Sequence, residues 1–259
     1  MNEYARSVLK KFFIAPLNAV GFDLVRKGVR PTGRSQTMPT WNQRLELAGQ
    51  LGFSPQVILD GGAFRGLWSK EAASVFPGAQ FVVIEPNPFV QEVIAKNVAH
   101  LQPSPRILNV ALGESPGQAA FNMWNDQNSD TGASLLDHVC GQARQTIQVQ
   151  VDTLDDIAQR LQLKPDLVKL DLQGAELQAL KGATEVLKHA EVMMIEFGCL
   201  DAYIGRATPR DVLQIMYEND YCLYDIVDLG YRPYDGAMRG GDFIFVKNSS
   251  ALRSHKGWK

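Results

Sequence analysis

From residue 57 onward the chain alternates short apolar runs with stretches of helical periodicity, and this alternation limits the fold more than any other feature. The apolar runs have the length of strands, and near-continuous apolar strands are typical of a parallel sheet buried on both faces. Strands that alternate with helices predict an α/β domain in which helices cover both faces of that sheet. The predicted strands are residues 57–60, 80–85, 106–110, 166–171, 191–196, 222–227 and 242–247.

Two stretches between these strands show a clear helical pattern. Apolar residues recur at helical spacing in residues 90–101 and 177–187, as expected for helices that cover a sheet. Residues 118–123 and 146–151 instead alternate with a period of two, which predicts a β-hairpin insertion. The polar tip of this insertion, residues 125–134, is expected to be a recognition loop.

The chain divides into three predicted parts. Residues 1–50 are a helical extension and linker, residues 51–248 form the α/β domain, and residues 249–259 are a flexible tail. Within the extension, residues 4–13 place apolar side chains on one helical half and basic ones mostly on the other. We expect this amphipathic helix to pack on the domain or to form a homodimer contact, and the alternative is peripheral contact with a membrane surface.

The composition is that of an ordinary globular protein, with 45% hydrophobic and 21% charged residues among 259. A formal net charge of −2 gives the whole chain no electrostatic attraction to nucleic acid, so no nucleic-acid partner is expected. Cys140, Cys199 and Cys222 show neither CxxC pairing nor metal-ligand spacing, which indicates a reducing, cytoplasmic compartment. Because Lys10 and Lys11 interrupt the N-terminal apolar stretch, it is expected to be neither a signal sequence nor a membrane span.

The first segment that suggests chemistry is the strand at residues 57–60, which ends in Asp60 and runs into a glycine turn at residues 61–66. Glycine is needed where the backbone approaches a ligand closely or takes a positive φ. Such a turn is common without any ligand, so by itself it is weak support for a binding site.

The strand at residues 80–85 strengthens that interpretation. It ends in Glu85, 19 residues beyond Gly66, and an acid about 20 residues past a glycine turn suits the two hydroxyls of a ribose. The turn is not G-x-G-x-x-G, because position 63 is Ala63, and Asp60 places a carboxylate where it would repel a pyrophosphate. A ligand with ammonium and sulfonium charge is favoured there, and we therefore expect S-adenosylmethionine rather than NAD.

A third segment, residues 166–176, again consists of a strand, a turn and the start of a helix. Asp171 ends this strand and Glu196 ends the next one, at the edge where open α/β sheets bind ligands. We predict Asp171 and Glu196 as the candidate general bases, ahead of Asp242 and His138. The three acids could hold Mg²⁺ through oxygen ligands, but no dense carboxylate motif requires a metal and none is expected.

Lys169 lies inside the same strand, where a charged residue is unusual unless it is paired. The candidate partners are Asp171, Glu196 and Glu176. Glu176 also lies in a first helical turn, where the helix dipole alone would explain an acid.

These segments resemble the FkbM family of methyltransferases over about residues 57–246. The residues that carry the resemblance are Asp60-Gly61-Gly62-Ala63-Phe64-Arg65-Gly66, Glu85-Pro86-Asn87, Asn109-Val110-Ala111-Leu112-Gly113, Thr153-Leu154-Asp155, Lys169-Leu170-Asp171-Leu172-Gln173-Gly174-Ala175-Glu176-Leu177 and Leu180-Lys181-Gly182-Ala183. The resemblance implies a class I methyltransferase fold, Rossmann-like, with a seven-stranded and mostly parallel sheet whose last strand is antiparallel. It also implies S-adenosylmethionine-dependent O-methylation of a hydroxyl on a small molecule, sugar or glycan.

The resemblance further assigns residues to the cofactor. Its methionine part is expected beside the first motif, its ribose at Glu85 and its adenine near residues 109–112. The cofactor-binding residues expected from the motifs are Asp60, Gly61, Gly62, Ala63, Gly66, Glu85, Pro86, Asn109, Ala111 and Leu112. Gln173 departs from the family pattern, since many members carry Glu at that position, and this puts a role that requires charge there in doubt.

Two functions from other classes stay open beside the methyltransferase. One is an NAD-dependent oxidoreductase, and the other is a catalytically silent protein that binds the cofactor and acts as a partner. A basic N-terminus, with seven Lys and Arg against two acids in the first 34 residues, would also suit association of a cytoplasmic enzyme with a membrane.

Overall fold

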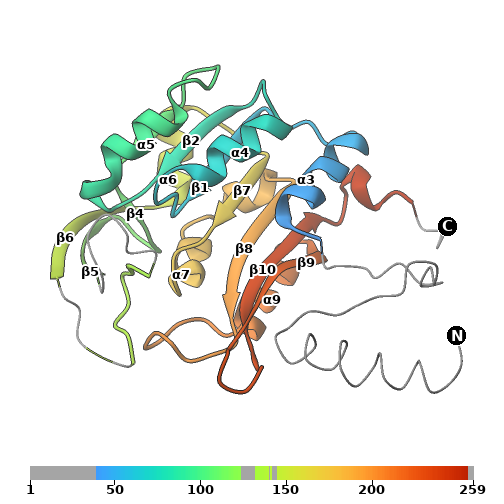
Figure 1. Cartoon of the computed structure of the whole chain (residues 1–259). Helices are drawn as coiled ribbons and strands as arrows, with labels where there is room; N and C mark the ends of the chain where they lie inside the picture. The colour runs from blue at the N-terminus through green and yellow to red at the C-terminus, as the bar shows by residue number, and fades with distance from the viewer. Residues whose placement is uncertain (1–38, 124–131, 140, 142–144, 256–259) are drawn as a thin grey trace, which may run out of the picture. The chain divides into compact units, whose positions relative to one another are not determined.

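The computed structural model describes residues 39–123, 132–139, 141 and 145–255, all within one compact unit that begins at Met38 (Figure 1). The predicted amphipathic helix at residues 4–13 and most of the predicted recognition loop lie outside the described residues. In the part of the chain that is described, no helix is long and apolar enough to cross a membrane.

A seven-stranded sheet forms the centre of this unit, in the order β3-β2-β1-β7-β8-β10-β9 (Figure 1). Its strands are β1 (Val57–Gly61), β2 (Gln80–Ile84), β3 (Arg106–Leu108), β7 (Leu167–Leu170), β8 (Val192–Gly198), β9 (Tyr221–Tyr231) and β10 (Met238–Lys247). The first five in this order run parallel, whereas β10 pairs antiparallel with both β8 and β9. This confirms the predicted class I methyltransferase fold, including its antiparallel last strand.

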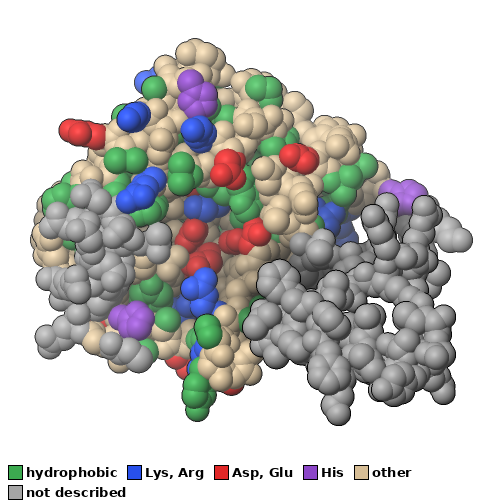
Figure 2. Space-filling view, viewed as in Figure 1, with side chains coloured by type: hydrophobic (Ala, Val, Ile, Leu, Met, Phe, Trp, Pro, Cys, Tyr) green, Lys and Arg blue, Asp and Glu red, His purple; other side chains and the backbone are tan. Residues whose placement is uncertain are grey.

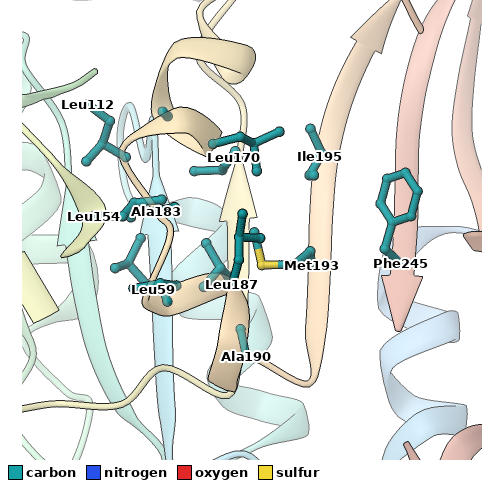
Figure 3. Close-up of a cluster of buried hydrophobic side chains, with 14 of the residues drawn as sticks. Leu59, Leu112, Leu154, Leu170, Ala183, Leu187, Ala190, Met193, Ile195 and Phe245 are labelled. Atoms are coloured by element: carbon teal, nitrogen blue, oxygen red, sulfur yellow. The ribbon is translucent and has the colours of Figure 1, made fainter. Parts of the chain in front are cut away.

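Helices cover both faces of the sheet because successive side chains of a buried strand point to opposite sides. On one face Ile58 packs with α3 (Trp41–Gln50), α4 (Leu67–Val75) and α5 (Gln91–Val98). On the other face Leu59 packs with α6 (Leu154–Leu161), α7 (Glu176–Lys181), α8 (Val186–His189) and α9 (Pro209–Glu218). Figure 3 shows this second cluster, in which the strand residues Leu59 and Met193 lie on either side of the helical Leu187.

Helix α3 lies within the stretch predicted as extension and linker. Thr40 begins it with a capping box to Gln43, and the buried side chains of Leu45 and Ala48 belong to the core. At the other end of the unit, Leu252 of the 3₁₀ helix η3 (Ala251–Arg253) packs into the same cluster. The compact unit therefore extends beyond the predicted domain of residues 51–248 at both ends. It includes α3 before that range and η3 after it.

The predicted β-hairpin insertion is present as a second, three-stranded sheet. Strands β5 (Gly117–Met123) and β6 (Gln145–Asp152) pair antiparallel, as their two-residue period predicts. The short strand β4 (Ala111–Leu112) adds to β6 in parallel, which the sequence did not predict. Because β4 follows directly after the end of β3, the insertion is anchored beside the main sheet.

The apolar pattern at residues 177–187 predicted one helix, and this was wrong, because the structure has two, α7 and α8. The helix is interrupted at Gly182. The Gly182 carbonyl oxygen accepts a hydrogen bond from the Asp155 backbone N–H. The Asp155 carboxylate then accepts from the N–H groups of Glu185 and Val186, which begin α8. A Cβ at position 182 would lie 2.3 Å from the Gly113 carbonyl oxygen, so this junction needs glycine.

We expect Gly182→Ala to lower the free energy of unfolding by about 2 kcal/mol, because backbone must move to admit the methyl group. Urea denaturation monitored by circular dichroism measures this change. Gly78→Ala is the matched control, since no heavy atom lies within 4 Å of a Cβ at that position. Equal denaturation midpoints for the two variants would contradict the packing argument.

Candidate active site

A cavity of about 390 Å³ opens at the carboxyl ends of β1, β2, β7 and β8, the edge where open α/β sheets bind ligands. Its walls are the turn after β1, the end of β2, residues 110–112, part of the insertion, the loop after β7, Glu196 and Arg239. Acidic and basic side chains gather side by side at the centre of the face seen in Figure 2. The volume falls in the usual range for small-molecule sites.

The turn after β1 brings the backbone against the loop after β7. Gly62 has a φ of +72°, and a Cβ there would lie 1.9 Å from the Asp171 carbonyl oxygen. Gly66 also has a positive φ, and it begins α4 in close contact with Val98. Gly62 and Ala63 border the cavity, as predicted for the first motif.

Asp60 does not line the cavity. Its carboxylate is fully buried beneath the turn, where it accepts a hydrogen bond from Ser69 Oγ at 2.6 Å and pairs with Lys169 Nζ at 3.2 Å. Lys169 Nζ also donates to the Gly62 carbonyl oxygen and lies 3.6 Å from Asp171 Oδ2. Burial acts to lower the pKa of Lys169, but Asp60 and Asp171 overcome it and raise that pKa above its ordinary value.

Among the partners predicted for Lys169, Asp171 is therefore correct and Asp60 was missed. Residues 60 and 169 are direct neighbours in the pairing of β1 with β7, a register that the sequence alone does not reveal. The Asp60 carboxylate, expected to face the cofactor, serves Lys169 and Ser69. Its influence on a ligand is thus exerted through the Lys169 ammonium, which does line the cavity.

Glu85 lines the cavity at the end of β2, as predicted. Its two carboxylate oxygens accept hydrogen bonds from the N–H groups of Phe64 at 2.7 Å and Asn87 at 2.9 Å. Burial raises the pKa of Glu85 to about 7 against the opposing effect of these donors. Asn109 supports this corner from behind, because its carboxamide donates to the carbonyl oxygens of Glu85 and Pro86.

Among the described residues, Asn109 therefore supports residues of the cavity wall but does not itself line the cavity. The wall in this region consists of Pro86 and of Val110, Ala111 and Leu112. These apolar side chains lie in the same cavity as the Glu85 carboxylate, a combination that suits the base and the ribose of a nucleoside.

The acids predicted at the strand ends do come together. Asp171 and Glu196 both line the cavity, and Asp242 lies directly opposite Glu196 in the pairing of β10 with β8. Burial and the charge of Asp171 raise the pKa of Glu196 well above its ordinary value, and they raise the pKa of Asp242 to about 7. Within the described ranges, no group of three or more His, Cys, Asp or Glu residues is arranged to hold a metal ion.

Glu176 shapes the loop after β7. Its buried carboxylate accepts hydrogen bonds from the N–H groups of Leu172 and Gly174, at 2.8 and 3.1 Å. These bonds fold the loop so that Gln173, at a φ of +53°, lies over the strand ends. In the sequence Glu176 stood in a family motif, in the first turn of a helix and as a candidate partner of Lys169, but none of these signals indicated bonds to the loop backbone.

Several walls of the cavity were not predicted. Phe121 and Leu135 come from the insertion and Arg239 comes from strand β10, whereas Ala133 lies within the predicted recognition loop at residues 125–134. Their position depends on contacts between distant segments, so no local motif marks them. His138 is not a cavity wall, and its ring packs against Tyr203 at 5.4 Å.

Comparison with known proteins identifies the family of the chain. A family model described as the methyltransferase FkbM domain matches residues 60–231. The 2-O-methyltransferase NoeI of Sinorhizobium fredii is 27% identical over 176 residues, which cover 62% of this chain and 70% of that protein. The match confirms the resemblance found in the sequence motifs.

Solved structures similar to this chain include two methyltransferases with bound SAM. The magnesium protoporphyrin IX methyltransferase ChlM from Synechocystis PCC 6803 gives a TM-score of 0.47 at 13% identity, over 94% of this chain and 95% of that chain. The O-methyltransferase TomG from Streptomyces achromogenes gives 0.43 at 15% identity, over 80% and 79% of the two chains.

We expect Lys169→Met to lower the free energy of unfolding by about 3–5 kcal/mol, because the Asp60 carboxylate is left buried without its counter-charge. Adding Asp60→Asn in the same chain should restore most of that loss. Urea denaturation at neutral pH measures both. Lys188→Met removes an exposed lysine paired with Glu185 and should leave the midpoint almost unchanged. A double variant as unstable as Lys169→Met alone would show that the ion pair is not the cause.

Proposed function

The chain belongs to the FkbM methyltransferase family, and from this premise we propose that it transfers a methyl group from S-adenosylmethionine to a hydroxyl oxygen. The observation that carries the proposal is that one cavity joins Glu85, at the end of β2, with Asp171 and Glu196, at the ends of β7 and β8. Glu85 is suited to bind the hydroxyls of a ribose. Asp171 and Glu196 are suited to accept the proton of the acceptor hydroxyl.

The donor side of the cavity fits S-adenosylmethionine. The oxygens of Glu85 each accept one backbone N–H and keep capacity for ribose hydroxyls, and Val110 and Leu112 offer apolar contact to adenine. Gly62 and Asp171 line the cavity together, and the methionine part would lie beside them. When bound, S-adenosylmethionine supplies a methyl group on a positively charged sulfur.

Glu196 is the better candidate for the general base. Asp171 lies within ion-pair distance of Lys169, whereas Glu196 has no ion-pair partner among the residues that the structure describes. Burial and the charge of Asp171 raise the pKa of Glu196, so its carboxylate takes up a proton more readily than an ordinary one. The acceptor hydroxyl would give its proton to Glu196 as its oxygen gains the methyl group.

Correct placement of the acceptor oxygen contributes more than the base. Proximity and orientation can supply about 7–11 kcal/mol of the barrier, compared with a rate factor of about 10² to 10⁴ for a general base. The acceptor side of the cavity, by which we mean the walls from Phe121, Ala133, Leu135 and Arg239, is suited to that placement.

We further propose that the acceptor is a small molecule, sugar or glycan. The name of NoeI, a 2-O-methyltransferase, supports transfer to oxygen. The acceptor side combines apolar side chains with Arg239 and lies in the same cavity as the two carboxylates, and this mixture suits a polyhydroxylated ligand. Cytoplasmic location and contact with a membrane surface stay proposals.

Membership of a methyltransferase family removes the support for an NAD-dependent oxidoreductase. Calorimetry with S-adenosylmethionine and with NAD checks this directly, and binding of NAD alone would overturn the proposal. A methyl-transfer screen with labelled cofactor over free sugars, glycan fragments and small phenols then tests the acceptor. Cofactor binding without transfer to any of them would favour the catalytically silent alternative.

We expect Glu196→Gln to lower kcat by about 10²- to 10⁴-fold while the Kd of S-adenosylmethionine changes little, because the variant keeps the shape but cannot accept the proton. Steady-state kinetics on the acceptor found in the screen, with calorimetry for the cofactor, measures the two effects. Glu218→Gln, at an exposed position on α9, is the control. An unchanged kcat in Glu196→Gln would exclude it as the base.

We expect Glu85→Ala to weaken S-adenosylmethionine binding by about tenfold or more, because it removes an acceptor of charge-assisted hydrogen bonds from ribose hydroxyls. Calorimetry measures the Kd. Glu92→Ala, an exposed acid in the first turn of α5, should bind as the wild type does. If Glu85→Ala keeps wild-type affinity, the ribose lies elsewhere.

A further inference from the structure

Gln173 lies at the centre of the active site, and its contacts reach in two directions. On one side its Nε2 donates to Asp171 Oδ1 at 2.8 Å and lies 3.3 Å from both carboxylate oxygens of Glu196. On the other side its Oε1 lies 3.1 Å from the Tyr203 hydroxyl, and its main-chain oxygen accepts from Ser134 Oγ at 2.9 Å.

A carboxamide is suited to the first pair of contacts. Its two N–H donors point to two carboxylates, which have no donors of their own when ionised. A carboxylate at this place would offer no donor and would add a third negative charge to the group. The amide therefore offers a hydrogen-bond donor to both carboxylates.

The second pair of contacts leads to the acceptor side. Ser134 is fully buried, accepts from the Leu136 N–H and pairs with Asn122 of β5, so it belongs to the folded base of the insertion. Tyr203 lies in the loop after β8, and its hydroxyl is also 2.9 Å from the Gly132 carbonyl oxygen. Gln173 thus joins the two acids to both of these segments, to the Tyr203 loop through its side chain and to the insertion through its main-chain oxygen.

We infer that Gln173 is a positioning residue: its carboxamide holds the Asp171 and Glu196 carboxylates and ties them to the loop that carries Tyr203, while its main-chain oxygen bonds the insertion. Its role for the reaction rests on the proposed function. The consequence is that the placement of the base and the placement of the acceptor are set by the same residue.

The charges around Glu196 predict the direction in which its pKa changes when Gln173 is replaced. Burial, Asp171, Glu176 and Asp242 raise the pKa of Glu196, and Arg206 lowers it. A hydrogen-bond donor to the carboxylate also favours its ionised form. Replacing this donor by an acid removes the stabilisation and adds repulsion, so both changes raise the pH at which Glu196 loses its proton.

The experiment is the pH dependence of kcat for Gln173→Glu. We expect the acid side of the profile to move upward by about one to two pH units, the effect of losing a hydrogen bond to a charged group, with activity recovering at higher pH. Gln173→Met, which loses the donor without adding charge, should lower kcat by about tenfold with the KM of S-adenosylmethionine unchanged.

Gln162→Glu is a matched control, since Gln162 is exposed and has almost the same backbone conformation, with a φ of +54°. Its pH profile should coincide with that of the wild type. A wild-type profile for Gln173→Glu, or a wild-type kcat for Gln173→Met, would overturn the inference.

A second measurement separates this inference from the proposed function. The carboxyl group introduced by Gln173→Glu would lie next to two acids, so the folded state should keep a proton that the unfolded state releases, and stability should fall as pH rises. The Tm of Gln173→Glu should therefore drop further below that of the wild type between about pH 5 and pH 8, while Gln162→Glu shows a constant difference. If the wild type methylates nothing, the proposed function fails. A constant Tm difference for Gln173→Glu would refute the contact with the acids on its own.

Discussion

The buried ion pair between Lys169 and Asp60 is the interaction on which the site depends. Both side chains are almost fully enclosed, and either charge alone would be costly in the middle of the sheet. The pair therefore specifies that β1 lies next to β7 in one register. That register brings the Gly62 turn against the loop after β7, and the same ammonium binds the turn and approaches Asp171.

The acids around this ammonium differ in what compensates their charge. Glu85 is bonded by two backbone N–H groups, Asp171 lies beside Lys169, and Glu196 lies within hydrogen-bond distance of the Gln173 carboxamide. Environments that differ in this way separate the proton affinities of chemically similar groups. A single cluster can thus offer one carboxylate for recognition, one for electrostatic balance and one to receive a proton.

The sequence was informative wherever a signal is local. Strand length, apolar runs and an acid at each strand end predicted the sheet, Glu85, Asp171 and Glu196, because the carboxyl ends of parallel strands meet at one edge. Local pattern failed where distant backbone decides the outcome. The helix break at Gly182 arises from the Gly113 carbonyl, and the partner of Lys169 arises from sheet register.

The two halves of the cavity differ in how the chain builds them. The donor side consists of strand ends and their turns, which the sheet holds rigidly, and motifs in the sequence mark it. The acceptor side consists of walls from the insertion and of Arg239 in β10, whose carbonyl oxygen accepts from the Cys199 N–H in the loop after β8. These segments meet the strand ends through Gln173 and Arg239, so their residues can change the acceptor without disturbing the Lys169 pair that supports the donor side.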